Sequence, residues 1–215
     1  MKMNKVSFFA IISMMVLAPA AHALNFDFVS DGDPGATVQF DGSSKTFNFA
    51  PASTGYDFVI RSSDNANLVG LKGNFTGVFT IGSITTTGGL QTAPVTGTGQ
   101  FSVFDGSATL TADLVWNSAF SFGTIVGLND VGLPNLSNVS YSGSNSGLQQ
   151  LASEINQTAS LSTQFVPGKT LTQLTAANSF YEATYSGTYN SVVPEPTTMV
   201  TLLGLGAAAL RRKRK

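Results

Sequence analysis

The feature that most constrains this chain is the alternation of apolar and polar residues in short runs. A period of two places the apolar side chains on one face of a strand, so each run predicts a half-buried β-strand. The clearest runs are Phe26/Phe28, Phe47/Phe49, Phe58/Ile60 and Leu110/Ala112/Leu114/Trp116. Pairs that favour turns lie between the runs: Asp31-Gly32, Asp41-Gly42, Gly88-Gly89 and Asp105-Gly106.

Many short strands with frequent turns predict an all-β fold over residues 24–190, mainly an antiparallel β-sandwich. The chain has no cysteine, so apolar packing must hold this domain together without disulfides. Sixteen phenylalanines and an apolar share of 42% are enough for the core of a single domain.

One stretch departs from the strand pattern and predicts a short helix near residues 146–158. Leu148, Leu151 and Ile155 have helical spacing, and Ser146 with Gln149 is placed as a capping box. We expect this helix to pack over an edge or an end of the sheet.

Residues 1–23 have the three parts of a secretory signal peptide. Lys2 and Lys5 precede an apolar run over residues 6–17, and Ala21 and Ala23 are small residues two positions apart. We expect an N-terminal signal helix that signal peptidase removes by cutting after Ala23. The alternative is an uncleaved anchor, for which roughly 12 apolar residues are too few to span a ~30 Å hydrocarbon core.

Residues 191–215 form a second three-part segment. Pro194, Glu195 and Pro196 precede an uncharged apolar run over residues 197–210. The chain then ends in a basic stop: Arg211, Arg212, Lys213, Arg214 and Lys215. We expect a C-terminal transmembrane helix whose basic end stays in the cytoplasm. At ~1.5 Å per residue the run reaches about 21 Å, which suits a transient anchor; an ordinary single-span tail is the alternative.

This tail resembles the PEP-CTERM sorting signal of Gram-negative bacteria. In proteins with that signal, the membrane enzyme exosortase recognises the tail, and such systems accompany exopolysaccharide and biofilm production. The resemblance implies that exosortase is a partner and that the membrane anchor is transient. It further implies that the product reaches the outer surface or the extracellular matrix. The same tail is also catalogued as the C-terminal region of some ice-binding proteins.

The charge of the predicted exported product differs from that of the whole chain. Residues 24–196 hold four lysines and arginines against twelve aspartates and glutamates, a net charge of −8, although the whole chain carries −1. Nucleic acid is therefore not an expected partner, because no basic stripe can neutralise phosphates.

Catalysis has little support in the sequence. The only histidine, His22, lies in the predicted signal peptide, and there is no cysteine. The predicted mature chain thus lacks the commonest general base and the commonest transition-metal ligand, and it has no thiol for nucleophilic catalysis. A glycosidase would need two paired carboxylates, and no local motif pairs the available ones, which are Asp105, Asp113, Asp130, Glu154 and Glu182. A serine–lysine dyad would have to use Lys45, Lys72 or Lys169, and each of these lies in an ordinary solvated context. We therefore expect no catalytic residues and no enzyme, with a hydrolase as the third hypothesis.

Three aspartates near the start of the domain are weak candidates for a calcium site. Asp27, Asp31 and Asp33 offer carboxylate oxygens around a glycine, which are the ligands Ca²⁺ uses. Their spacing is not that of an EF-hand, and a plain turn explains them equally well. No other metal or cofactor is expected.

Two binding hypotheses remain beside a structural or adhesive role in a polysaccharide matrix. Glycan binding needs exposed aromatic rings, and the candidates are Trp116, Tyr141, Tyr181, Tyr185 and Tyr189. We expect Trp116 to lie in the core, and leave Tyr185 and Tyr189 open. Ice binding needs a flat threonine array, and the candidates are the pairs Thr85/Thr87, Thr96/Thr98, Thr109/Thr111 and Thr170/Thr172. Their spacing along the chain is irregular, and threonine is also common on the solvent-exposed faces of ordinary strands.

Overall fold

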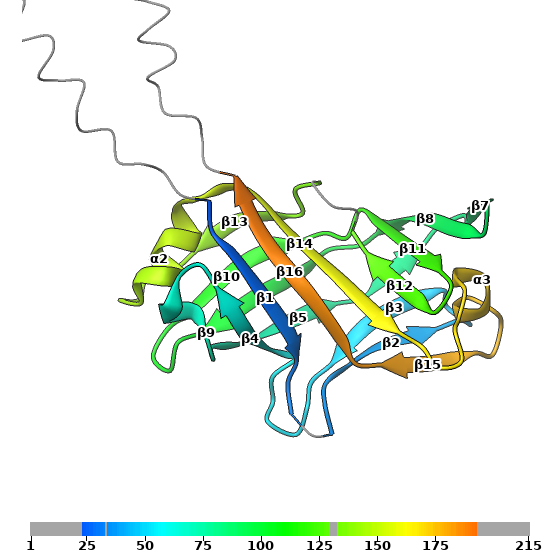
Figure 1. Cartoon of the computed structure of the whole chain (residues 1–215), viewed down its shortest axis with the longest axis horizontal. Helices are drawn as coiled ribbons and strands as arrows, with labels where there is room; N and C mark the ends of the chain where they lie inside the picture. Colours follow the sequence, from blue (N-terminus) through cyan, green and yellow to red (C-terminus); the bar gives the residue numbers. More distant parts are fainter. Residues whose placement is uncertain (1–22, 33, 130–132, 193–215) are drawn as a thin grey trace, which may run out of the picture. The chain divides into compact units, whose positions relative to one another are not determined.

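Strands make up most of the residues that the computed structural model describes, which are 23–32, 34–129 and 133–192 (Figure 1). The strands are β1 (Asn25–Ser30), β2 (Thr37–Asp41), β3 (Thr46–Ala50), β4 (Phe58–Ser63), β5 (Lys72–Gly77), β6 (Phe79–Ile81), β7 (Thr85–Thr87), β8 (Leu90–Thr96), β9 (Gly99–Phe104), β10 (Thr109–Leu114), β11 (Ser118–Phe122), β12 (Ile125–Leu128), β13 (Leu136–Ser140), β14 (Ile155–Gln164), β15 (Phe180–Ala183) and β16 (Tyr185–Val192). The helical segments among these residues are η1 (Ala66–Leu68), α2 (Ser146–Ser153) and α3 (Leu171–Leu174).

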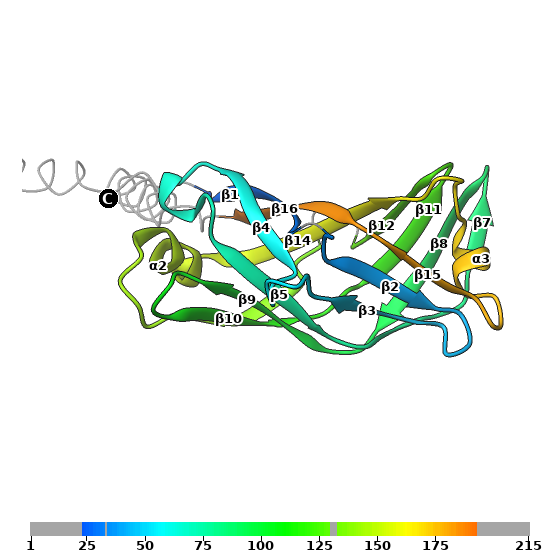
Figure 2. The same ribbon diagram turned by 90° about the horizontal axis from the view of Figure 1, so that it is seen from below.

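All sixteen strands belong to one sheet, and all of its pairings are antiparallel. The order is β13-β10-β9-β5-β4-β1-β16-β14-β12-β11-β8-β6-β3-β2-β15, with β7 added to β8. Figure 2 shows this sheet curled around its interior as a half-barrel. The predicted antiparallel all-β class is confirmed. The prediction of a two-sheet sandwich is wrong, because a single curled sheet encloses both sides of the core.

Glycines mark the place where two long strands cross from one half of the sheet to the other. β5 continues into β6 as one long strand, and β8 continues into β9 as another. The two long strands pair with each other, β5 with β9 and β6 with β8. At the crossing Gly77 and Gly97 have φ of 117° and 120°, a region that glycine adopts without strain. A Cβ on Gly77 would lie 2.8 Å from the Cα of Gly99, so the strands approach too closely for a side chain. This bend lets the sheet curl rather than split into two layers.

One edge of the sheet is tied back to its middle by a buried asparagine. Asn135, just before edge strand β13, accepts a hydrogen bond from the backbone N–H of Ala159 on β14 at 2.7 Å. Its side-chain amide donates to the carbonyl of the same residue at 2.9 Å. The β13 edge is thereby held beside β14, which protects it from pairing with another chain.

The core inside the curl is dominated by aromatic rings. Each of the predicted runs turns one face inward, and Trp116 is 1% exposed, which confirms its predicted place in the core. Phe75 lies among six other rings: Phe28, Phe49, Phe58, Phe101, Trp116 and Tyr185.

The predicted helix is present but shorter than expected. α2 ends at Ser153, and Glu154 already has extended backbone angles. Ile155 belongs to β14, where it pairs with Val192 and is 47% exposed, so its place in the helical pattern was wrong. The N-cap is Asn145 rather than Ser146, because the Asn145 side chain accepts from the N–H groups of Gly147 and Leu148.

Among the described residues no helix is both long and apolar enough to span a membrane. Residues 1–22 of the predicted signal peptide (residues 1–23) and the predicted C-terminal transmembrane helix lie outside the described residues.

Candidate functional site

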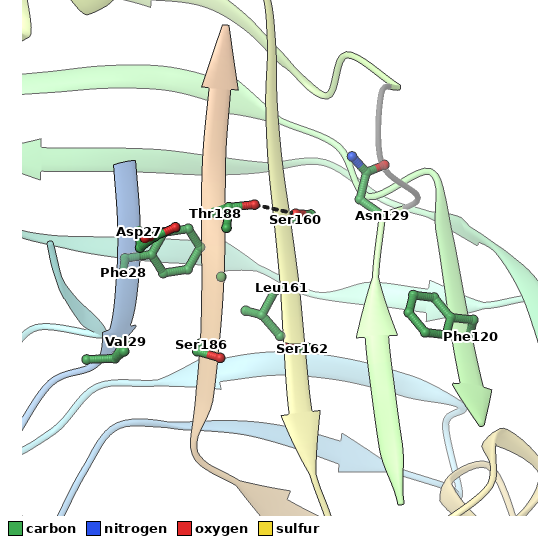
Figure 3. A pocket seen from close by; sticks show the side chains of 11 residues that line it. Asp27, Phe28, Val29, Phe120, Asn129, Ser160, Leu161, Ser162, Ser186 and Thr188 are labelled. Atoms are coloured by element: carbon green, nitrogen blue, oxygen red, sulfur yellow. Dashed lines mark hydrogen bonds between the residues drawn. The ribbon is translucent and has the colours of Figure 1, made fainter. Parts of the chain in front are cut away.

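The outer face of the sheet carries an elongated trough, formed by two depressions that share Ser162 and Ser186. The first depression, of about 340 Å³, is shown in Figure 3; its lining is Asp27, Phe28, Val29, Phe120, Asn129, Ser160, Leu161, Ser162, Ser186, Gly187 and Thr188. The second, of about 480 Å³, is lined by Ile125, Ser162, Thr163, Gln164, Thr184, Tyr185 and Ser186. We call the two together the outer-face trough.

Cross-strand register builds the polar floor of the trough. Thr188 on β16 lies opposite both Asp27 on β1 and Ser160 on β14. Ser186 and Ser162 form the next such pair along the same strands. The Ser160 and Thr188 hydroxyl oxygens lie 2.9 Å apart, joined by the hydrogen bond drawn in Figure 3. The floor is therefore a row of hydroxyl groups, held at spacings set by the backbone.

Apolar side chains form one wall of the trough. Phe120 on β11 lies opposite Gly127 on β12, and Phe122 lies opposite Ile125. Phe122 is 59% exposed and Ile125 46% exposed, while Phe120 is half-buried. Phe120 and Ile125 line the trough and give it an aromatic and aliphatic wall beside the hydroxyl floor, whereas Phe122 lies outside the lining.

Sequence reasoning missed this wall. In β11 the buried residues are Ala119 and Ser121, while Phe120 and Phe122 alternate with them and face outward. Ser121 is held inward because its hydroxyl accepts from the backbone N–H of Leu171 at 2.9 Å, at the start of α3. The alternation alone gives the opposite orientation, since it assigns aromatic residues to the core. No local signal in this strand indicates the inversion.

Asp27 is the one charged residue that lines the trough. Its carboxylate accepts from the Ser62 hydroxyl on β4 at 2.7 Å, and its side chain is exposed. No lysine, arginine or histidine is among the lining residues. The trough therefore has a weakly acidic and otherwise uncharged surface.

The structure places the three calcium candidates differently. Asp27 lies in the trough, whereas Asp31 is 5% exposed and forms an ion pair with Lys72 Nζ at 2.8 Å. Asp31 also accepts from the Thr54 hydroxyl, and its pKa is lowered by the Lys72 and Thr54 hydrogen bonds against the opposing effect of burial. Asp33 lies outside the described residues. Within the described ranges no group of three or more histidines, cysteines, aspartates or glutamates is arranged to hold a metal ion. The calcium site stays a prediction.

The carboxylates considered for hydrolysis lie on separate elements. Asp105 accepts from the Tyr141 hydroxyl and from the backbone N–H groups of Ser107 and Ala108, and these hydrogen bonds hold its pKa well below the usual range. Asp113 accepts from Asn138, and Glu182 from Gln39. Glu154 caps α2, and Asp130 lies outside the described residues. The four described carboxylates of this set therefore have structural roles in a turn, a cap or a strand face.

The other predicted binding residues are also separated in space. Tyr185 and Tyr189 are 5% and 0% exposed, so their rings belong to the core. Tyr141 and Tyr181 are half-buried, and Tyr181 packs under Lys169. The four threonine pairs lie on β7, at the β8–β9 bend, on β10 and at α3, so they form no common array. Thr80 on β6 lies opposite both Thr46 on β3 and Thr96 on β8, but none of the four predicted pairs adds a second residue to this row.

Asp57 is a buried titratable group that makes stability depend on pH. Its Oδ2 accepts from the Phe75 N–H at 2.7 Å, and its Oδ1 is buried with no hydrogen-bond partner in the part of the chain that the structure describes. Burial raises its pKa to about 6. Because the folded-state pKa lies above the unfolded-state value, this group stabilises the fold increasingly as pH falls from about 6 towards 4. We expect the domain to be about 1.5 kcal/mol more stable at pH 5 than at pH 7.5.

Urea unfolding at the two pH values measures this difference. Asp57→Asn keeps an oxygen that can accept from Phe75 and should remove most of the gain. The remainder belongs to Glu154, whose pKa burial also raises. An unchanged pH dependence in the variant would show that Asp57 is not its source.

Comparison with protein families identifies the segment that follows the domain. Residues 192–215 match the model of the PEP-CTERM protein-sorting motif. The match confirms the resemblance seen in the sequence, and it includes Pro194, Glu195, Pro196 and the five basic residues. Neither the curated proteins nor the solved structures gave a match.

The class of protein follows from this motif. It implies an exported protein that exosortase processes and that is sorted to the cell surface of a Gram-negative bacterium. The chain carries the PEP-CTERM sorting motif behind an all-β domain. The motif residues and the Ala21 side of the predicted signal-peptidase site lie outside the described residues, while Ala23 is described and exposed.

Proposed function

We propose that this protein is a non-enzymatic component of the bacterial surface or extracellular matrix that adheres to polysaccharide through the outer-face trough. The observation that carries the proposal is the trough itself: a hydroxyl floor on β14 and β16 beside an apolar wall of Phe120 and Ile125. The sorting motif supports the location, since it delivers the domain to the surface where such polymers lie.

The chemistry of the trough fits a sugar chain. A sugar ring has an apolar C–H face and a hydroxyl edge, so it can stack on Phe120 while its hydroxyls bond to the serine and threonine floor. From Thr188 to Thr184 the floor runs about 13 Å at ~3.3 Å per residue, long enough for a short stretch of a polymer. A shallow site gives weak binding at each contact, and a repeating polymer offers many such contacts to a protein-covered surface.

Charge favours an uncharged polymer over an acidic one. Asp27 lines the trough, and residues 24–196 carry a net charge of −8. A polyuronate or sulfated chain would meet repulsion both in the trough and in the field of the whole domain. The proposal therefore names a neutral polysaccharide as the ligand class.

The absence of a catalytic role is part of the same proposal. The carboxylates of the described residues mostly serve caps, turns and an ion pair, and the predicted mature chain holds no histidine and no cysteine. The trough has a single carboxylate, whereas hydrolysis of a glycosidic bond ordinarily uses two.

The test is a pair of surface variants in the full chain. Phe120→Ser removes the aromatic wall of the trough and should weaken retention on neutral polysaccharide about tenfold, since a stacked ring contributes on the order of 1.4 kcal/mol. Phe180→Ser is the matched control, because Phe180 is 60% exposed on edge strand β15 and does not line the trough. Affinity electrophoresis in gels with neutral or acidic polysaccharide measures the retention.

Each outcome bears on a separate part of the proposal. Equal retention of both variants would mean that the trough is not the site that binds polysaccharide. Retention on acidic polymers alone would contradict the neutral ligand class and leave adhesion standing. Failure on every polymer would overturn the proposed function, and thermal hysteresis in the same sample would favour the ice-binding alternative.

A further inference from the structure

The fold begins at a residue whose backbone nitrogen lies inside a polar cluster. Leu24 is 1% exposed, whereas Ala23 before it is exposed. The Leu24 N–H donates to the Ser191 hydroxyl at 2.9 Å, and the Ser191 N–H donates back to the Leu24 carbonyl at 3.1 Å. The boundary of the packed domain thus coincides with the residue that follows the predicted cleavage site.

Glu154 adds a carboxyl group to this cluster. It is the C-cap residue of α2, next to Ile155, which pairs with Val192 at the end of β16. Its Oε1 accepts from Gln150 at 3.1 Å, while its Oε2 is buried and has no hydrogen-bond partner among the described residues. Burial raises the pKa of Glu154, and the Ser191 hydroxyl and the Leu24 N–H act in the opposite direction, so both donors lie beside the carboxyl.

We propose that cleavage after Ala23 places the new α-ammonium group of Leu24 against Glu154, where the two form a partly buried ion pair. Hydrolysis of the Ala23–Leu24 peptide bond consumes one water, leaves a carboxylate on Ala23, and leaves an amine on Leu24 that takes up a proton near neutral pH. The ammonium group has three N–H donors where the amide had one. It can keep the bond to Ser191 and also donate to the free Oε2 of Glu154.

The surroundings contain few other charges that would compete. Tyr189, on β16, has a buried hydroxyl without a partner among the described residues, and its pKa is raised by burial and by the charge of Glu154, so it stays neutral. Asp64 follows β4 and accepts from the Asn25 side chain at 2.9 Å, on the exposed side of β1. Among the described residues, Glu154 is therefore the carboxylate beside the Leu24 N–H. Removal of the leader then neutralises a half-buried carboxylate and stabilises this end of the domain.

The experiment uses mature protein recovered from cells that express the full-length chain with ¹⁵N-labelled leucine. N-terminal sequencing should give Leu24 as the first residue. The ¹⁵N resonance of its α-amino group should titrate about one pKa unit above the ordinary value of about 7.7–8.0, because an opposite charge favours the ammonium form. Glu154→Gln should return that titration to the ordinary range, and Asp64→Asn should leave it raised.

Stability gives a second readout with a defined sign. A raised folded-state pKa of the amine contributes stability that is present below about pH 8 and is lost as pH rises through the folded-state value. The melting temperature of the wild type should therefore fall between pH 7 and pH 10. This fall should be larger than the fall measured for Glu154→Gln over the same pH range. A mature chain that begins at another residue would overturn the proposal. An ordinary α-amino pKa in wild type would overturn it whatever the variants do.

Discussion

Replacing Phe75 with alanine should lower the free energy of unfolding by about 4 kcal/mol and the melting temperature by about 8–16 °C. Phe75 is 1% exposed, and its ring lies 4.9 Å from those of both Phe49 and Phe58, between centroids. Removing the ring loses its burial and leaves a cavity that neighbouring rings on different strands cannot fill together. A domain of this size has a total stability of roughly 5–15 kcal/mol, and this one has no disulfide to support it.

Urea and thermal unfolding of the purified domain measure this loss. Phe122→Ala is the matched control, because the same atoms are removed from a ring that is 59% exposed, and its effect should stay within about 0.5 kcal/mol. A loss of under about 1.5 kcal/mol for Phe75→Ala would mean that the aromatic cluster is not where the curled sheet gains its stability.

Deleting residues 193–215 should remove the protein from the cell surface and release nearly all of it in soluble form. The deleted segment contains most of the match to the PEP-CTERM sorting motif, and with it the sequence by which exosortase recognises the chain. The folded domain should be unaffected, since the hydrogen bonds of β16 to β1 and β14 involve residues up to Val192. Immunoblots of surface, membrane and medium fractions, with melting of the released domain, measure both effects.

The control for this deletion changes only the charge of the tail. Replacing the five terminal basic residues with glutamine keeps the proline-containing motif and the apolar run intact. We expect this variant to accumulate in the membrane fraction or to be processed slowly, because the basic end sets the orientation of the segment. Normal surface delivery of the deleted chain would show that sorting does not depend on the motif.

Much of the strand content could be predicted because strand periodicity is local. Leu110, Ala112 and Leu114 alternate with polar residues, and all three are buried in β10. The same local reasoning identified Trp116 as a core residue. The helix prediction failed at its C-terminal end. Ile155 fits a helical period, but it pairs with Val192 on β16 and therefore belongs to strand β14.

The sheet architecture could not be read in this way, because the pairings that decide it join distant parts of the chain. β1 pairs with β16, so Phe26 lies beside Tyr189. An alternating strand looks the same in a sandwich and in a curled sheet. The difference rests on the bend at Gly77 and Gly97, whose effect depends on the two strands already being paired.

The candidate site was predictable only in part. Asp27 was singled out for its carboxylate, and the structure places it in the trough, although for a reason unrelated to calcium. The serine and threonine floor arises from the registers of β1, β14 and β16, which no local pattern specifies. Phe120 and Phe122 face outward because the Ser121 side chain faces inward, where its hydroxyl accepts a hydrogen bond from the N–H of Leu171 at the start of α3. These two residues are 50 positions apart in the sequence, so no local pattern indicates their contact.

The intact mass of the native protein recovered from outside its own cells tests the central claim most directly, namely that the chain is a sorted surface protein. The account predicts a mass that lacks residues 1–23 and also lacks the tail beyond the Pro194-Glu195-Pro196 region, with any additional mass identifying the attached group. A mass that retains residues 197–215 would contradict it, because the tail would then be a permanent membrane anchor and not a processed sorting signal.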